Sequence, residues 1–188
     1  MARIYMKNLG GFIMKVAVIS YSLTGNNEAL ANSIAEELVV EHIKIKETKS
    51  RTISSIVLDM IFNRTPQVQT TPDKLGNYDL ILFFAPIWMG QVATPLRAYL
   101  KHLKTNPCKY AFISISGGAD GANPKLAGEL KKRVGKEPDA LMDLHIADLL
   151  TSDPKPTRKD TSAYRINNGD IKKLTDIIIK TVREMIQN

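Results

Sequence analysis

Apolar residues along the chain fall into two kinds of pattern, and each pattern predicts one kind of element. Continuous apolar runs, such as those at 16–19 and 80–85, are typical of strands that are covered on both faces of a parallel sheet. Elsewhere apolar residues recur three or four positions apart, as Leu30, Ile34 and Leu38 do, which predicts amphipathic helices. The expected strands are 15–21, 42–47, 79–85, 110–116 and 141–150, and the expected helices are 28–40, 54–62, 95–104, 124–134 and 171–187.

The regular alternation of strands and helices predicts the fold class. Short loops between such elements imply right-handed crossovers and an α/β fold, a doubly wound five-stranded parallel sheet with helices on both faces. We choose the strand order 2-1-3-4-5. The chain has 188 residues, 44% of them hydrophobic, which is enough to bury a substantial core. We expect residues 14–188 to form one domain and residues 1–13 to be an N-terminal extension.

The first loop, between the strand 15–21 and the helix 28–40, is rich in hydroxyls and amides. Its notable residues are Ser22, Thr24, Gly25, Asn26 and Asn27. Because the loop opens a helix, free backbone N–H groups and the positive end of the helix dipole favour a phosphate there, and the side chains can add donors. No Lys or Arg occurs from position 22 to 43, so neutral donors would hold such a phosphate. An ordinary capped strand-to-helix turn is the alternative.

Two common phosphate-binding motifs are absent from this loop. The Gly-x-x-x-x-Gly-Lys spacing of a Walker loop is missing, and so is the Gly-x-Gly-x-x-Gly of dinucleotide-binding proteins, because Gly25 is the only glycine here. The terminal phosphate of a mononucleotide therefore fits better than a pyrophosphate. The segment from Ser22 to Asn27 resembles the Thr/Ser-x-Thr-Gly-Asn-Thr phosphate loop of flavodoxins and flavodoxin-like FMN proteins, with Asn27 in place of the last hydroxyl residue.

A second loop strengthens this resemblance. It resembles the Pro-Ile-Trp-x-Gly flavin loop of the same family and consists of Pro86, Ile87, Trp88, Met89 and Gly90. After it, Thr94 is expected to cap a helix that starts at Pro95, and Arg97 is expected to face water on that helix. Placed on a loop, Trp88 is available to stack on an isoalloxazine ring. The alternative is that Trp88 only closes the end of the core.

The third loop follows the strand 110–116 and contains Ser116, Gly117 and Gly118. Glycines there let the backbone approach a ligand closely, and a flexible connection is the alternative. In open α/β sheets ligands bind beyond the carboxyl ends of the strands, and all three loops lie at such ends. The resemblance implies that the protein binds FMN, with the phosphate on the first loop, the ring along the second and its polar edge at the third.

Other chemistries find little support in the sequence. Cys108 is the single cysteine, so no internal disulfide can form, a reducing cytoplasm is the expected compartment, and a buried, inert thiol is expected. His42, His102 and His145 have no metal-ligand spacing, so no metal site is expected. No stretch approaches the roughly 20 apolar residues of a membrane span. No catalytic acid or base is identified, so function is expected to come from a bound cofactor.

Net charge and one long loop bear on the function within this class. The net charge is +7, whereas the electron-carrier flavodoxins that the chain resembles are typically acidic. Few aromatics accompany the basic residues, so no nucleic-acid partner is expected. The loop 151–168 is long enough to rim a substrate pocket, and a plain surface insertion is the alternative.

The resemblance and the charge together lead to one functional expectation. We expect an FMN-dependent oxidoreductase similar to NAD(P)H:quinone and flavin reductases, which passes electrons from NAD(P)H through FMN to a quinone or similar small acceptor. A homodimer is a candidate assembly. The first alternative is a one-electron flavodoxin that serves a redox partner protein, and the second is a flavin-free interaction module with the same fold.

Overall fold

The computed structural model describes residues 5–7, 13–48, 52–150 and 155–187. Within this part of the chain the parallel strands of the sheet lie in the order β3-β2-β4-β7-β8. Their bounds are β2 (Ile13–Ser20), β3 (Glu41–Lys44), β4 (Leu80–Phe84), β7 (Lys109–Ser116) and β8 (Ala140–His145). Numbered along the chain, these parallel strands have the order 2-1-3-4-5, so the predicted doubly wound fold is confirmed. A short strand that was not predicted, β1 (Tyr5–Lys7), pairs antiparallel with the start of β2.

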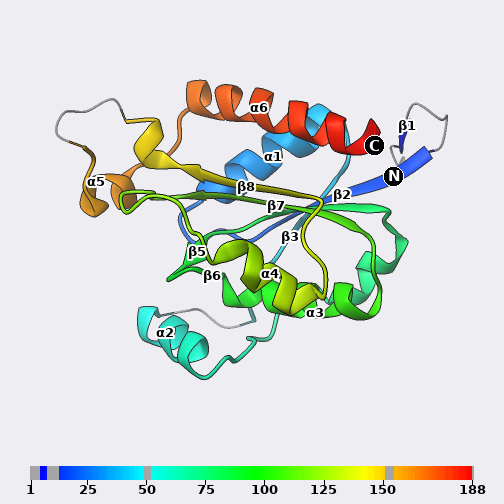
Figure 1. The fold of residues 1–188 in the computed structure, drawn as a ribbon, viewed down its shortest axis with the longest axis horizontal. Coiled ribbons are helices and arrows are strands. Elements are labelled where there is room, and N and C mark those ends of the chain that lie inside the picture. Colours follow the sequence, from blue (N-terminus) through cyan, green and yellow to red (C-terminus); the bar gives the residue numbers. More distant parts are fainter. Residues whose placement is uncertain (1–4, 8–12, 49–51, 151–154, 188) are drawn as a thin grey trace.

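Helices cover both faces of the sheet (Figure 1). One face carries α1 (Asn26–Leu38) and α6 (Asn168–Gln187), and the other carries α3 (Arg97–Thr105) and α4 (Leu126–Val134). All five residues of β4 are buried because alternate side chains of a strand enter opposite cores. Leu80, Leu82 and Phe84 pack with α1 and α6, whereas Ile81 and Phe83 pack with α3 and α4. The continuous apolar run thus reflects burial on both faces of the sheet, as predicted.

Several shorter elements lie between these strands and helices. The predicted helix at 54–62 is α2 (Ile53–Ile61), which lies apart from the sheet beyond β6 in Figure 1. A hairpin of β5 (Ile87–Trp88) and β6 (Gln91–Val92) follows β4. Within the long loop expected at 151–168, residues 151–154 lie outside the described residues, and a short helix α5 (Arg158–Ala163) follows them. Single 3-10 turns occur at Pro72–Asn77, Thr94–Leu96 and Ile146–Asp148.

The start of the expected helix 95–104 differs from the prediction. The chain makes the 3-10 turn first and becomes α-helical only at Arg97. Thr94 does not cap it, because the N–H of Leu96 already donates to the carbonyl of Ala93 at 3.0 Å. The hydroxyl of Thr94 is buried and has no hydrogen-bond partner among the described residues. The prediction of Thr94 as a capping residue was therefore wrong.

Candidate functional site

The carboxyl ends of β2, β4 and β7 carry the three loops singled out in the sequence, and side-chain contacts join these loops. Tyr21, directly before the first loop, makes a T-shaped contact with Trp88 of the second, with 5.8 Å between ring centroids and 85° between the planes. Asn27 bonds the backbone of Ile115, directly before the third loop. The structure therefore brings residues 22–27, 86–90 and 116–118 to one edge of the sheet.

The first loop presents neutral donors at the start of α1. Gly25 adopts φ +93°, which favours glycine, and a Cβ built there would meet nothing within 4 Å. The N–H of Gly25 donates to Ser22 Oγ at 3.0 Å, so the hydroxyl proton of Ser22 is left to donate elsewhere. Thr24 is exposed. Because helix geometry leaves the first N–H groups of α1 without intrahelical acceptors, they add to this donor set together with the helix dipole.

The side chains of Asn26 and Asn27 are not the phosphate donors that the sequence suggested. Both are almost fully buried, at 4% and 2% exposed. Asn26 donates to the carbonyl of Tyr164 at 3.1 Å and accepts from the N–H of Ile166 at 3.2 Å. Asn27 donates to the carbonyl of Ile115 and accepts from its N–H, each at 3.0 Å. These side-chain amides hold neighbouring segments in place. Only the backbone N–H groups of the two residues remain available to an anion.

The carboxylate beside the first loop is paired. Glu28, in the first turn of α1, forms an ion pair with Lys44 of β3 at 2.7 Å. A carboxylate at this position would otherwise compete with a bound anion for the positive end of the helix dipole. The ion pair offsets that negative charge, so the start of α1 remains suited to an anion.

A partly buried polar cluster lies between α1 and the sheet. Nε2 of His42 lies 2.8 Å from Ser20 Oγ, and its Nδ1 lies 2.7 Å from Asn32 Oδ1. Burial, aided by Lys44, lowers the pKa of His42 to about 4, so the ring is neutral at neutral pH. The arrangement has the spacing of a nucleophile with its base, but Ser20 is only 1% exposed. The cluster therefore ties α1 to β2 and β3 and does not meet a substrate.

The second loop is a tight hairpin. Trp88 pairs with Gln91 across it, and Met89 and Gly90 form the turn with φ +50° and φ +77°. Two positive φ angles in a two-residue turn are typical of type I′ geometry. Met89 at the tip is 84% exposed, whereas Ile87 and Trp88 are partly buried against the core beneath α3 and α4. Trp88 thus closes the end of this core and stays partly exposed beside the first loop.

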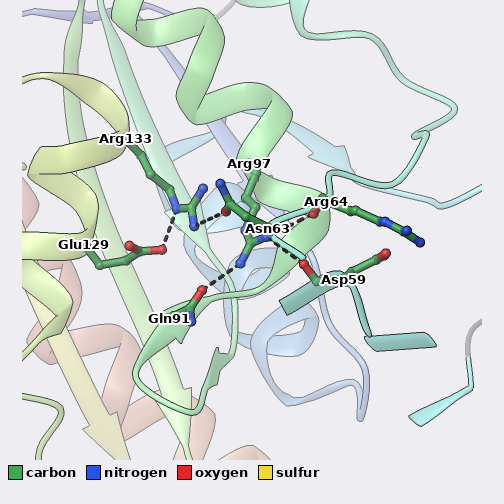
Figure 2. Close-up of polar contacts among 7 residues, drawn as sticks. All are labelled: Asp59, Asn63, Arg64, Gln91, Arg97, Glu129 and Arg133. Atoms are coloured by element: carbon green, nitrogen blue, oxygen red, sulfur yellow. Dashed lines mark hydrogen bonds and ion pairs between the residues drawn. The ribbon is translucent and has the colours of Figure 1, made fainter. Parts of the chain in front are cut away.

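Arg97, which was expected to face water, is buried behind this hairpin. It is 3% exposed and donates to Gln91 Oε1 at 2.8 Å and to the carbonyl oxygens of Asp59 and Arg64 at 3.2 and 3.0 Å (Figure 2). The prediction followed from the helical spacing of the apolar residues, which places Arg97 on the polar face of the helix. It was wrong because two of the acceptors are carbonyl groups more than 30 positions earlier in the chain, which no local pattern reports.

The third loop is packed onto β8 and the residues that follow it. Gly118 has φ +71°, and a Cβ built there would lie 2.3 Å from Cβ of His145. Asp143 Oδ2 accepts from the backbone N–H and the side-chain amide of Asn123, each at 2.9 Å. The close approach that Gly118 permits is therefore an approach to His145 within the protein. The same packing sets the backbone of the loop at the carboxyl edge.

The end of the long loop spans the first and third loops. The helix α5 starts with a capping box formed by Thr157 and Asp160. Arg158 of α5 forms an ion pair with Asp120, beyond the third loop's glycines, at 2.8 Å. Beyond α5, the segment 164–166 is held by Asn26 of the first loop. Residues 158–166 thus form a strap between these two loops.

Three further features of the described residues concern membrane helices, metal ligands and the single thiol. No helix in this part of the chain is long and apolar enough to cross a membrane. No group of three or more His, Cys, Asp or Glu side chains within it is placed to hold a metal ion. Burial raises the pKa of Cys108 to about 11, so the thiol is protonated and poorly nucleophilic at neutral pH.

Solved structures share this architecture. A flavoprotein from Lactobacillus acidophilus, crystallised in complex with FMN, matches with a TM-score of 0.59 and 26% identity over 69% of this chain and 93% of its own. A Bacteroides eggerthii protein assigned as a flavoprotein has a TM-score of 0.62 and 16% identity over 88% and 98%. Oxidised flavodoxin 2 from Bacillus cereus has a TM-score of 0.52 and 14% identity over 90% and 98%. The chain has a flavodoxin-like fold.

Comparison of the sequence with families and curated proteins adds no closer assignment. No family model matches the chain, and no curated protein sequence matches it. The flavodoxin-like fold that the resemblance implied is nevertheless confirmed by the structural likeness, and the first and second loops lie at the carboxyl edge of its sheet.

Some residues that organise this candidate site were missed in the sequence. Tyr21 supports Trp88, and its hydroxyl donates to Glu47 at 2.7 Å. An aromatic residue directly before a loop of small polar residues is a signal that could have found it. Asp143 holds Asn123 from a strand 20 residues further along the chain, and nothing near either residue in the sequence indicates this pairing.

Proposed function

We propose that the protein binds one FMN at the carboxyl edge of its sheet and acts as an FMN-dependent oxidoreductase. It takes electrons from NADH or NADPH and passes them to a quinone or similar small acceptor. The observation that carries the proposal is the meeting of three loops, two of them of flavodoxin-like sequence, joined by the contact of Tyr21 with Trp88 and by the hydrogen bonds of Asn27 to Ile115. The likeness to the Lactobacillus acidophilus flavoprotein crystallised with FMN supports the choice of cofactor.

The donor set of the first loop fits a phosphate monoester. It combines the hydroxyls of Ser22 and Thr24 with the first N–H groups of α1, and the sequence offers no cation from 22 to 43. Hydrogen bonds and the helix dipole can stabilise a phosphate without a cation. The hairpin residues Pro86 to Gly90 would lie along the flavin ring, and Ser116, Gly117 and Gly118 would lie at its polar edge. Bound FMN supplies the electron-transfer chemistry, and the chain supplies binding and orientation.

Charge favours a reductase over a carrier. The net charge is +7, and the strap adds exposed cations, among them Lys159 and Arg165, beside the loops. An acidic docking face, typical of the carriers that the chain resembles, is difficult to build on such a protein. A one-electron carrier is the second candidate, because the apolar tip residue Met89 is 84% exposed and suits contact with a partner protein.

Two measurements on the purified full-length chain test the proposal. Titration with FMN and with riboflavin, followed by Trp88 fluorescence, should show about one FMN per chain and weaker riboflavin binding. Under anaerobic conditions NADH or NADPH should then reduce the bound FMN, and benzoquinone should reoxidise it. Equal affinity for both flavins, or none for either, would refute the phosphate assignment. Tight FMN binding without nicotinamide-driven reduction would leave the carrier as the better candidate.

A further inference from the structure

The guanidinium of Arg97 joins the second loop to the end of α2. Figure 2 shows it between Gln91 of β6 on one side and the backbone of Asp59 and Arg64 on the other. A buried charged group costs free energy unless hydrogen bonds satisfy it. Displacement of the hairpin would remove the 2.8 Å bond to Gln91 Oε1, so the structure resists that displacement.

The hairpin needs support from outside itself. Its strands have two residues each, and isolated short hairpins have little stability in water. Its turn places a methionine at φ +50°, where type I′ turns prefer Asn or Asp, and side chains other than these are disfavoured in the left-handed region. Met89 therefore does not stabilise the turn by itself, and the contact of Gln91 with Arg97 supplies the support that the hairpin lacks.

The position of Gln91 within the hairpin makes this contact relevant to the site. Gln91 is the residue that pairs with Trp88 across the hairpin. Trp88 in turn contacts Tyr21, which directly precedes the first loop. An unbroken series of contacts thus runs from Arg97 through Gln91 and Trp88 to the candidate phosphate loop.

We propose that Arg97 is a positioning residue that holds the hairpin 87–92 in the geometry required to bind the flavin ring. The inference rests on the proposed function for the identity of the ligand. Arginine suits this role because its planar fork presents several donors in fixed directions to acceptors on different segments, whereas lysine carries a single ammonium group. Because the same guanidinium also bonds the end of α2, the positions of α2 and of the hairpin are coupled.

A neighbouring arginine provides a matched control. Arg133 of α4 pairs with Glu129 and donates to Asn63 Oδ1 at 3.2 Å, next to Arg64 (Figure 2). This contact secures the same segment after α2 but involves no hairpin residue. Asn63 has φ +49°, so Asn63→Gly removes the acceptor and keeps a residue that tolerates this backbone conformation.

The test uses the full chain with and without FMN. Trp88 is the only tryptophan in the sequence, so its fluorescence reports on the hairpin in both conditions. Gln91→Ala removes the hairpin acceptor, Gln91→Glu retains an acceptor oxygen, and Arg97→Lys removes the fork. In Gln91→Ala and Arg97→Lys, acrylamide should quench Trp88 more strongly than in the wild type. FMN binding should weaken by about tenfold, as expected for the loss of one hydrogen bond to a charged group. The midpoint potential of bound FMN should also shift.

Gln91→Glu, which keeps an acceptor for Arg97, should match the wild type in Trp88 quenching without ligand, and Asn63→Gly should resemble the wild type in all three measurements. Unchanged Trp88 quenching and unchanged FMN affinity in Gln91→Ala would overturn the proposal, even if Arg97→Lys fails to fold. An equal loss in Asn63→Gly would also overturn it, because the effect would then come from α2 and not from the hairpin. A wild-type chain that binds no FMN would refute the proposed function, whereas the quenching of Trp88 without ligand decides the role of Arg97 in either case.

Discussion

Replacement of Asn27 by alanine should destabilise the fold whether or not a ligand is bound. Asn27 is 2% exposed and bonds both the N–H and the C=O of Ile115, which is itself 3% exposed. In Asn27→Ala both backbone groups lose their side-chain partner in a buried setting. An unsatisfied buried polar group costs about 1–3 kcal/mol, so the loss of two partners should lower the free energy of unfolding by about 2–6 kcal/mol.

Urea unfolding of the ligand-free chain, followed by circular dichroism, measures this change through the midpoint and the slope. Thr24→Ala is the matched control in the same loop. Thr24 is exposed, so its replacement should change the free energy of unfolding by no more than about 0.5 kcal/mol. A loss below about 1 kcal/mol in Asn27→Ala would refute the view that this amide is a structural clamp.

Three further outcomes are expected. Thr24→Ala should weaken FMN by about 1–3 kcal/mol and leave riboflavin unchanged in fluorescence titrations, if the hydroxyl donates to the phosphate. Gly118→Ala should lower thermal stability and FMN affinity more than Gly121→Ala, because both glycines have positive φ but only at Gly118 would a Cβ collide with His145, at 2.3 Å. Stability should fall as pH drops from 6.5 towards 4, since the pKa of His42 is about 4 in the fold and the unfolded chain binds its proton first. The loss, about 1–2 kcal/mol after allowance for partial solvent exposure, should disappear in His42→Gln; a pH profile unchanged by that variant would contradict the assignment.

The strand order and the meeting of the three loops at one edge could be predicted because both follow from local patterns. The apolar run at 80–85 predicts a strand covered on both faces, and β4 is buried on both faces. The alternation of strands with helices leaves few topologies, since crossovers are right-handed. Parallel strands then bring the loops that follow them to one edge. Ser22 and Trp88 could therefore be assigned to one candidate site before any tertiary contact was known.

The roles of individual polar side chains could not be predicted, because their partners lie far away in the sequence. Asn26 contacts residues about 140 positions further on, and Arg97 bonds carbonyl groups more than 30 positions earlier. Residue type alone suggested a phosphate donor in the first case and a solvated cation in the second. Both side chains are instead buried and bonded to backbone, where they fix one segment against another.

Because these buried side chains hold the backbone, different residues of the first loop serve stability and ligand binding. In the first loop, buried Asn26 and Asn27 hold the backbone, and the partly buried Ser22 and the exposed Thr24 are the candidate ligand contacts. Binding and stability should therefore respond to different substitutions there. The second loop has no such separation, because Gln91 and Trp88 face each other across one small hairpin, so a change in its support by Arg97 reaches the ligand-facing residues directly. Substitutions in the first loop should change affinity for a phosphate, whereas substitutions around Arg97 should change the environment of the ring.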